Sequence, residues 1–271
     1  MASRKLVVLV KQVPDPSKLR MDPKTGILMR EGIESTINPY DLHAIEAAVQ
    51  FKESFPAKEA PTIVVISMGP PQAEEALREA LARGCDEAIL VSDKKFAGSD
   101  TFATSYILSQ TIKKLENSID VIFAGSATVD GDTGQVGPQT GEWLGIPQIT
   151  YVDKIERKAG TLIVERTLGH QLQVIEAPYP LILLTVLPQL NEPRYPSFPR
   201  INWAYEQKIS VWTAADLDVD ETMIGLVGSP TQITGYATVK QARAGQVIQE
   251  RPKEAATKII SILKSKQVLE Q

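Results

Sequence analysis

Short, continuously apolar segments alternate along the first half of this chain with longer segments whose apolar residues have helical spacing. Continuous apolarity is typical of parallel strands that are covered on both faces. The longer segments begin at a proline or beside a glycine, as helices often do. Strand and helix in repeated alternation predict an α/β fold with a doubly wound, mostly parallel sheet. The predicted strands are residues 6–10, 62–67, 87–91 and 120–125, and the predicted helices are residues 39–54, 70–83, 99–115 and 134–144.

The pattern changes after Gln148. Two segments, 161–166 and 171–176, are expected to pair as a hairpin, and residues 181–186 form a further buried-strand candidate. Four prolines follow within residues 188–202, and this density blocks regular pairing, so we expect an exposed, extended arm there. A last helix is predicted at residues 252–266. The chain therefore divides into an α/β domain, residues 1–187, and a C-terminal extended arm, residues 188–271.

Composition argues against several classes of function. The net charge of −4 does not suit a nucleic-acid partner or an anionic membrane. One cysteine, Cys85, and two histidines allow neither an internal disulfide nor a zinc site of familiar spacing. No apolar run reaches the ~18 residues of a membrane span. We therefore expect a cytoplasmic protein with no metal site and no membrane span.

The loop at residues 125–138 is the most informative segment, because it follows a buried strand and opens a helix. In open α/β sheets ligands bind at the carboxyl ends of strands, and a helix N-terminus there favours an anion such as phosphate. Gly131 and Gly134 would permit close backbone approach. Asp130 and Asp132 would repel a phosphate if they pointed at it, so we expect them to hold the loop's shape or to contact sugar hydroxyls. The loop is neither a Walker phosphate loop nor a Gly-x-Gly-x-x-Gly fingerprint, so an ordinary tight turn stays an alternative.

Two other strand ends should lie beside this loop. One carries Lys11, at the end of the first strand, and the other carries Gly69, before the helix that begins at residue 70. Asn38 and Asp41 sit at the start of a predicted helix, where a capping role is the first expectation and a ligand contact the second.

No set of residues points to nucleophilic catalysis. There is no Gly-x-Ser-x-Gly elbow. His43 lies in a helical pattern, His170 in a turn, and Cys85 before a strand, where a small buried side chain is expected. The absence of catalytic residues fits a protein whose chemistry belongs to a cofactor.

Several segments, in order along nearly the whole chain, resemble motifs of the electron-transfer flavoprotein beta subunit family. They are Val-Lys-Gln-Val-Pro-Asp at 10–15, Asn-Pro-Tyr-Asp at 38–41, Ser-Met-Gly-Pro at 67–70, Asp-Gly-Asp-Thr at 130–133 with Gln-Val-Gly-Pro at 135–138, Leu-Asn-Glu-Pro-Arg-Tyr at 190–195 with Phe-Pro at 198–199, and Gly-Ser-Pro-Thr-Gln at 228–232.

This resemblance implies a Rossmann-like domain and a C-terminal arm that wraps an alpha subunit carrying the electron-transferring FAD. The beta subunit would bind FAD, or alternatively AMP; the form of residues 130–138 resembles the FAD-binding, electron-bifurcating branch. Electrons would pass between NADH or an acyl-CoA-type dehydrogenase and a quinone-linked or ferredoxin acceptor. Carried over by position, the nucleotide contacts would be Leu9, Val10, Met68, Gly125, Thr128, Gly131, Thr133, Gly134, Gln135 and Val136, with Thr101 and Thr104 near a flavin ring. The docking residues would be Glu192, Arg194, Tyr195 and Phe198, with Phe198 as an aromatic anchor.

The chain departs from this family at three places. Bifurcating members usually carry Arg-Gln where this chain has Ser126 and Ala127, which weakens the expectation of bifurcation more than that of nucleotide binding. The turn at 167–171 lacks an acidic cluster, and residues 202–208 replace a lysine-rich stretch. Two alternatives remain: a non-redox adenine-nucleotide-binding module of similar fold, and a nucleotide hydrolase. The second is disfavoured because this chain lacks a phosphate-loop lysine and a candidate base.

Overall fold

The computed structural model describes residues 4–15, 20–21, 28–29, 35–115, 119–158, 160–232, 245 and 247–268. The chain divides into two compact units, residues 1–234 and residues 235–271. The first unit contains the sheet and its covering helices, and the second contains helix α6 (Pro252–Ser265), the predicted last helix.

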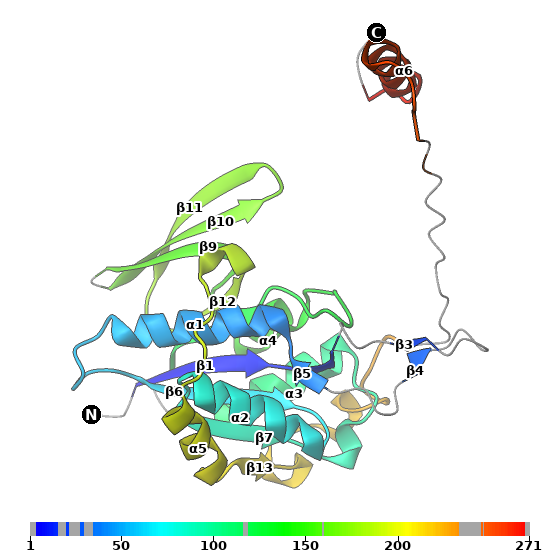
Figure 1. The fold of residues 1–271 in the computed structure, drawn as a ribbon. Helices are drawn as coiled ribbons and strands as arrows, with labels where there is room; N and C mark the ends of the chain where they lie inside the picture. Colours follow the sequence, from blue (N-terminus) through cyan, green and yellow to red (C-terminus); the bar gives the residue numbers. More distant parts are fainter. Residues whose placement is uncertain are drawn as a thin grey trace. The chain divides into compact units, whose positions relative to one another are not determined.

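A nine-stranded sheet forms the centre of the first unit (Figure 1). The strands that run across the sheet from β9 through β12, β8, β1, β6 and β7 to β13 are all parallel to their neighbours. At the other side of β9, strands β9, β10 and β11 pair antiparallel. The fold is thus the expected doubly wound, mostly parallel α/β fold. In order across the sheet, the strands are β11 (Gln171–Pro178), β10 (Thr161–Leu168), β9 (Gln148–Lys158), β12 (Ile182–Val186), β8 (Ile119–Gly125), β1 (Lys5–Val10), β6 (Thr62–Met68), β7 (Glu87–Val91) and β13 (Ser210–Trp212).

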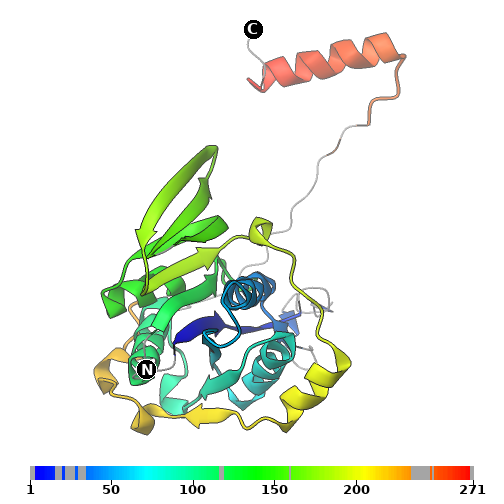
Figure 2. The same ribbon diagram turned by 90° about the vertical axis from the view of Figure 1, so that its left-hand side faces the viewer.

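Helices cover both faces of the parallel strands (Figure 2). Leu6 and Val8 of β1 belong to a core with α1 and α2, whereas Val7 and Leu9 belong to a core with α3 and α4. This alternation explains why the strands are apolar at every position. The helices are α1 (Pro39–Glu53), α2 (Glu74–Arg83), α3 (Thr101–Lys114), α4 (Val136–Leu144) and α5 (Phe198–Glu206), and the 3₁₀ turns are η2 (Pro71–Ala73), η3 (Lys94–Phe96), η4 (Pro188–Leu190), η5 (Ala214–Asp216) and η6 (Glu221–Met223).

The predicted hairpin is confirmed as β10 and β11, joined by a tight turn at Gly169 and His170. Strand β9, which the sequence did not predict, is the third member of this antiparallel part. Its second half alternates in exposure and is almost entirely charged, so it lacks the continuous apolar signal of the central strands. Two small ladders pair β2 (Gln12–Pro14) with β5 (Ser35–Ile37) and β3 (Arg20–Met21) with β4 (Leu28–Met29).

The segment after β12 is only partly the extended arm that its prolines predict. Residues 191–197 are irregular, but α5 begins at Phe198, so the expectation of extended backbone up to residue 202 is wrong. The Ser197 side chain caps the helix by accepting the Arg200 N–H, and Pro199 lies in the first turn, where a missing N–H costs nothing. Figure 2 shows this segment, in yellow, running past α1 and α2 to α5. Strand β13 then adds a short, unpredicted edge to the sheet.

The chain changes direction around β1. From β1 it proceeds through α1 to β6 and β7 on one side, then through α3 to β8 on the other side. The connections that follow β1 and β8 therefore lead in opposite directions along the sheet. Such a topological switch point is where doubly wound sheets bind ligands. Leu9 pairs with Ala124 of β8, and Val10 pairs with Ser67 of β6, so three strand ends meet at this switch point, where a ligand crevice is expected.

Candidate functional site

Asn38 joins the two loops that leave the crevice. Its side-chain Nδ2 donates to the Ala127 carbonyl at 2.9 Å, and its Oδ1 accepts the Val129 N–H at 3.3 Å. Its backbone N–H donates to the Lys11 carbonyl at 2.8 Å. Asn38 occupies the N-cap position of α1 but makes no side-chain capping bond, so the expected capping role is wrong. The amide instead fixes the loop after β8 against the end of β1.

Asp41 connects the same two strand ends by hydrogen bonds. Its Oδ2 accepts the Lys11 N–H at 2.7 Å, and its carboxyl also accepts hydrogen bonds from Asn38 and the Gly125 N–H. Only 4% of Asp41 is exposed. Burial raises the pKa of this carboxyl to about 7, although the hydrogen bonds and the nearby Lys11 ammonium oppose the shift. A Cβ on Gly125 would lie 2.4 Å from Asp41 Oδ1, so this brace requires glycine at the end of β8.

An ion pair joins the end of β1 to the loop after β8. The Lys11 ammonium lies 2.6 Å from Asp130 Oδ2 in the loop after β8. Burial opposes ionisation of Asp130, but hydrogen bonds from Lys11 and Thr128 outweigh it and lower the pKa of the carboxyl. Asp130 therefore contacts the strand end opposite to it, in addition to shaping its own loop.

The loop after β8 turns sharply before α4. Asp132 and Gly134 adopt left-handed backbone conformations, with φ of 49° and 62°. The Asp132 N–H donates to the Thr128 carbonyl at 2.8 Å. A Cβ on Gly134 would lie 3.1 Å from the Ser126 carbonyl, whereas a Cβ on Gly131 would meet only Thr128 Oγ1, at 3.5 Å. The loop thus passes close to itself at Gly134 and leaves room at Gly131.

The end of β6 forms the third side of the crevice. Met68 and Gly69 follow Ser67, and the Gly69 N–H donates to the Val91 carbonyl of β7. The Ser67 hydroxyl is fully buried and has no hydrogen-bond partner among the described residues. A buried hydroxyl without a partner carries an energetic cost that a bound polar group would remove.

The predicted flavin-side residues lie at the start of α3. Asp100 caps this helix through the Phe102 and Ala103 N–H groups, and its other oxygen accepts from the Thr231 N–H and hydroxyl. The Thr101 hydroxyl donates to Gln135 Oε1 at 2.9 Å. Thr104 is half-buried one turn later, where its N–H donates to the Asp100 carbonyl.

The structure connects seven of the candidate nucleotide residues. Hydrogen bonds or ion pairs join Lys11, Asn38, Asp41, Gly125 and Asp130, and a separate bond joins Thr101 to Gln135. Leu9 and Val10 are buried in β1, Thr133 is exposed, and Val136 starts α4. Sequence reasoning missed Ser67, Ala127 and Thr231 as contributors. For Ala127 and Thr231 nothing local indicates the contact, because the hydrogen bonds to Asn38 and Asp100 span 89 and 131 positions of the chain.

The predicted docking residues lie on another part of the unit, against α1 and α2. Arg194 forms ion pairs with Glu46 at 2.8 Å and Glu53 at 2.7 Å, so its charge is used inside the chain. Asn191 and His43 exchange further hydrogen bonds across the same contact, where His43 is half-buried. Tyr195 and Phe198 are 91% and 86% exposed. This segment is therefore fixed to two helices while it presents two aromatic rings to solvent.

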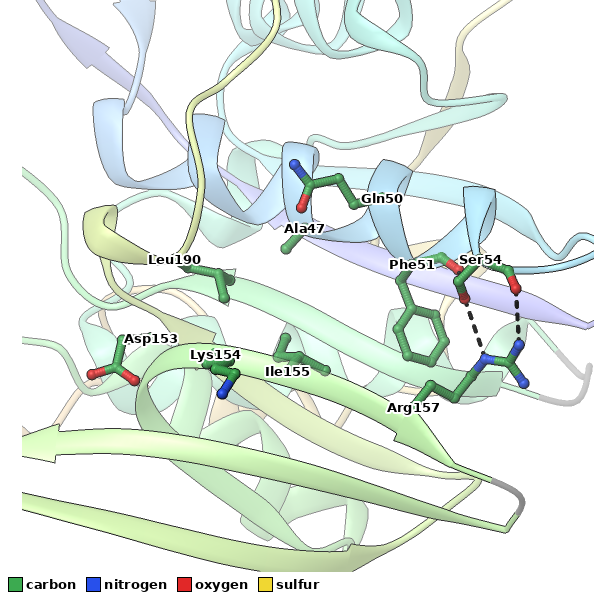
Figure 3. A pocket seen from close by; sticks show the side chains of 9 residues that line it. All are labelled: Ala47, Gln50, Phe51, Ser54, Asp153, Lys154, Ile155, Arg157 and Leu190. Atoms are coloured by element: carbon green, nitrogen blue, oxygen red, sulfur yellow. Dashed lines mark hydrogen bonds between the residues drawn. The ribbon is translucent and has the colours of Figure 1, made fainter.

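A hollow of about 200 Å³ lies between α1 and β9 (Figure 3). In Figure 3 Phe51 and Ile155 face it, and the Arg157 guanidinium reaches Ser54, whose carbonyl accepts at 2.9 Å. None of the candidate nucleotide residues lines it. The hollow is therefore separate from the predicted nucleotide site.

Comparisons with known proteins identify a matching family and several relatives. Residues 25–217 match the electron transfer flavoprotein domain. The chain is 46% identical over 259 residues to electron transfer flavoprotein subunit beta of Clostridium acetobutylicum, covering 96% of this chain and 97% of the relative.

Two other relatives have different names. One is caffeyl-CoA reductase-Etf complex subunit CarD of Acetobacterium woodii, 42% identical over 98% of this chain and 100% of the relative. The other is protein FixA of Azotobacter vinelandii, 41% identical over 90% of this chain and 87% of the relative. Within the described residues, no helix is both long and apolar enough to cross a membrane.

Proposed function

The chain belongs to the electron transfer flavoprotein beta-subunit family, and on that premise we propose that it binds FAD in the crevice at the ends of β1, β6 and β8. The observation that carries the proposal is the hydrogen-bonded arrangement at the topological switch point, where Asn38 and Asp41 join the end of β1 to the loop after β8. AMP in the same crevice is the alternative, with FAD confined to a partner subunit.

The residues present fit an adenine nucleotide. The Gln135 side chain does not cap α4, so N–H groups of its first turn remain available to a phosphate oxygen. The Lys11 side chain is 47% exposed at the end of β1, and the space at Gly131 allows a ligand to approach the backbone.

A flavin bound by this chain would supply the electron chemistry, and the protein would position it. Thr101 and Thr104 lie at the start of α3, whose first turn is held by Asp100 and the segment around Thr231. We assign these hydroxyls to the flavin ring. The similarity to CarD and FixA, together with the form of residues 130–138, supports the branch that carries a second FAD.

We further propose that the chain works in a heterodimer with an FAD-bearing alpha subunit and exchanges electrons with an acyl-CoA-type dehydrogenase, a quinone-linked oxidoreductase or NADH. The segment with Glu192, Arg194, Tyr195 and Phe198 would dock the redox partner. Its ion pairs to α1 pre-order the backbone, which lowers the entropic cost of docking an exposed aromatic anchor.

The deciding experiment is to co-purify the chain with its alpha partner, release the cofactors and quantify FAD and AMP per heterodimer. Two FAD and no AMP would support the proposal and make NADH oxidation and bifurcation worth testing. One FAD and one AMP would make the chain the nucleotide-holding subunit of a single-flavin carrier. A colourless preparation with no partner would contradict the redox function and favour a nucleotide-binding regulatory module.

A further inference from the structure

The three strand-end segments of the crevice contain very little positive charge. Lys11 is the only lysine or arginine within residues 10–15, 68–73 and 125–136. The loop after β8 instead contributes two carboxylates, Asp130 and Asp132. Within these three segments, a phosphate can therefore be held by one ammonium group and by backbone N–H groups.

The one cation of these three segments, Lys11, is already paired with a carboxylate. Asp130 lies 2.6 Å from the Lys11 ammonium, and Asp41 fixes the backbone N–H of the same lysine at 2.7 Å. The Lys11 and Asp130 side chains are 47% and 33% exposed, so a ligand can reach both charged groups. Asp132 is also exposed but takes part in none of the ion pairs found among the described residues. Only one of the two loop carboxylates is thus directed at Lys11.

We propose that Asp130 is a specificity-determining residue that restricts this crevice to adenine ligands of low phosphate charge. This inference rests on the nucleotide-binding function proposed above. With Asp130 paired to it, Lys11 cannot offer a phosphate a full positive charge, and the carboxylate repels each additional phosphate. A monophosphate or the diester diphosphate of a dinucleotide would be accepted, and a nucleoside triphosphate would be disfavoured.

The charge of the ligand sets the size of the effect. AMP and FAD each carry about two negative charges near pH 8, and ATP carries about four. Two unit charges about 6 Å apart in water change a binding constant by roughly threefold. Removal of the Asp130 charge should therefore favour AMP and FAD to the same extent and should favour ATP by about a further tenfold.

The test compares three versions of the full-length chain by titration calorimetry with AMP, ATP and FAD, in low salt with EDTA. The variant Asp130→Asn removes the charge and keeps the size of the side chain. The variant Asp132→Asn is the matched control, because it removes a carboxylate of the same loop that forms no ion pair of its own with Lys11. Asparagine tolerates the left-handed backbone of this position. Asp130→Ser serves as a second variant if Asp130→Asn does not fold.

We expect the ratio of ATP affinity to AMP affinity to rise about tenfold in Asp130→Asn and less than about threefold in Asp132→Asn. An unchanged ratio, or equal changes in both variants, would overturn the specificity role while nucleotide binding stands. If the unsubstituted chain binds none of the three ligands, the proposed nucleotide function itself fails, and this inference fails with it.

Discussion

At the scale of single residues, the buried carboxyl of Asp41 should make stability depend on pH. Its pKa is raised to about 7, whereas an unfolded aspartate titrates near ~3.9, so the folded chain holds this proton more tightly. The contribution to the free energy of unfolding therefore increases as the pH falls through 7, by about 2 kcal/mol between pH 7 and pH 5.

Urea unfolding at several pH values, for the chain and for Asp41→Asn, checks this contribution. The variant is expected to be less stable, because its amide leaves one of the backbone donors at Lys11 or Gly125 without an acceptor. The difference in stability between the two proteins should widen as the pH falls from 7 to 5. A difference that stays constant would mean that Asp41 does not titrate in this range.

Gly134 allows a second residue-scale prediction with a matched control. Gly134 and Gly145 both have left-handed φ values, 62° and 65°, so leucine at either position should cost about 1–2 kcal/mol of stability. A Cβ at Gly134 meets the Ser126 carbonyl at the crevice, whereas a Cβ at Gly145 meets nothing within 4 Å. We expect Gly134→Leu, but not Gly145→Leu, to weaken adenine-nucleotide binding at least tenfold in calorimetry. Equal affinities would remove Gly134 from the nucleotide site.

At the scale of elements, the docking segment between η4 and α5 should act in electron delivery and not in cofactor retention. Phe198 is 86% exposed at the start of α5, and the segment before it is fixed to α1 by Arg194. We expect Phe198→Ala to slow electron transfer to the dehydrogenase about tenfold or more, with flavin content unchanged, because truncating an aromatic anchor typically costs more than 1 kcal/mol of docking energy.

Stopped-flow kinetics with the dehydrogenase measure this effect. Val211→Ala is the control, since it shortens another exposed apolar side chain, 52% exposed on the edge strand β13. Equal rates for the two variants would exclude Phe198 as the anchor.

The elements also show how far the sequence could be interpreted. Continuous apolar runs located β1, β6, β7, β8 and β12 within two residues, because parallel strands covered on both faces leave no polar alternation. Three-residue β13 and the charged second half of β9 carry no such signal. The prolines around α5 hid a helix that Ser197 caps. At the site, the sequence predicted the loop after β8 as the ligand-binding segment. The hydrogen bond from Asn38 to Ala127 depends on tertiary packing that local sequence does not encode.

At the scale of the whole molecule, the two compact units suggest separate roles in nucleotide binding and in subunit association. The candidate crevice and the docking segment lie in residues 1–234, and helix α6 lies in residues 235–271. Apolar side chains of α6 share one stripe at helical spacing, at Ala255, Ile259, Ile262 and Leu263. A helix of this kind needs a partner surface to bury its stripe. We propose that α6 contributes to association with the alpha subunit and not to nucleotide binding.

Two substitutions on opposite sides of α6 test this division. Ile259→Asp places a charge on the apolar stripe, and Ser261→Asp places the same charge on the other side of the same helix. We expect Ile259→Asp to weaken the heterodimer at least tenfold in sedimentation or dilution experiments, because it would bury an unpaired carboxylate at the interface. Nucleotide affinity of the chain should be the same in both variants, since α6 supplies none of the crevice residues. Equal heterodimer stability in the two variants would mean that α6 does not contact the partner, and a loss of nucleotide affinity would show that the two units do not act separately.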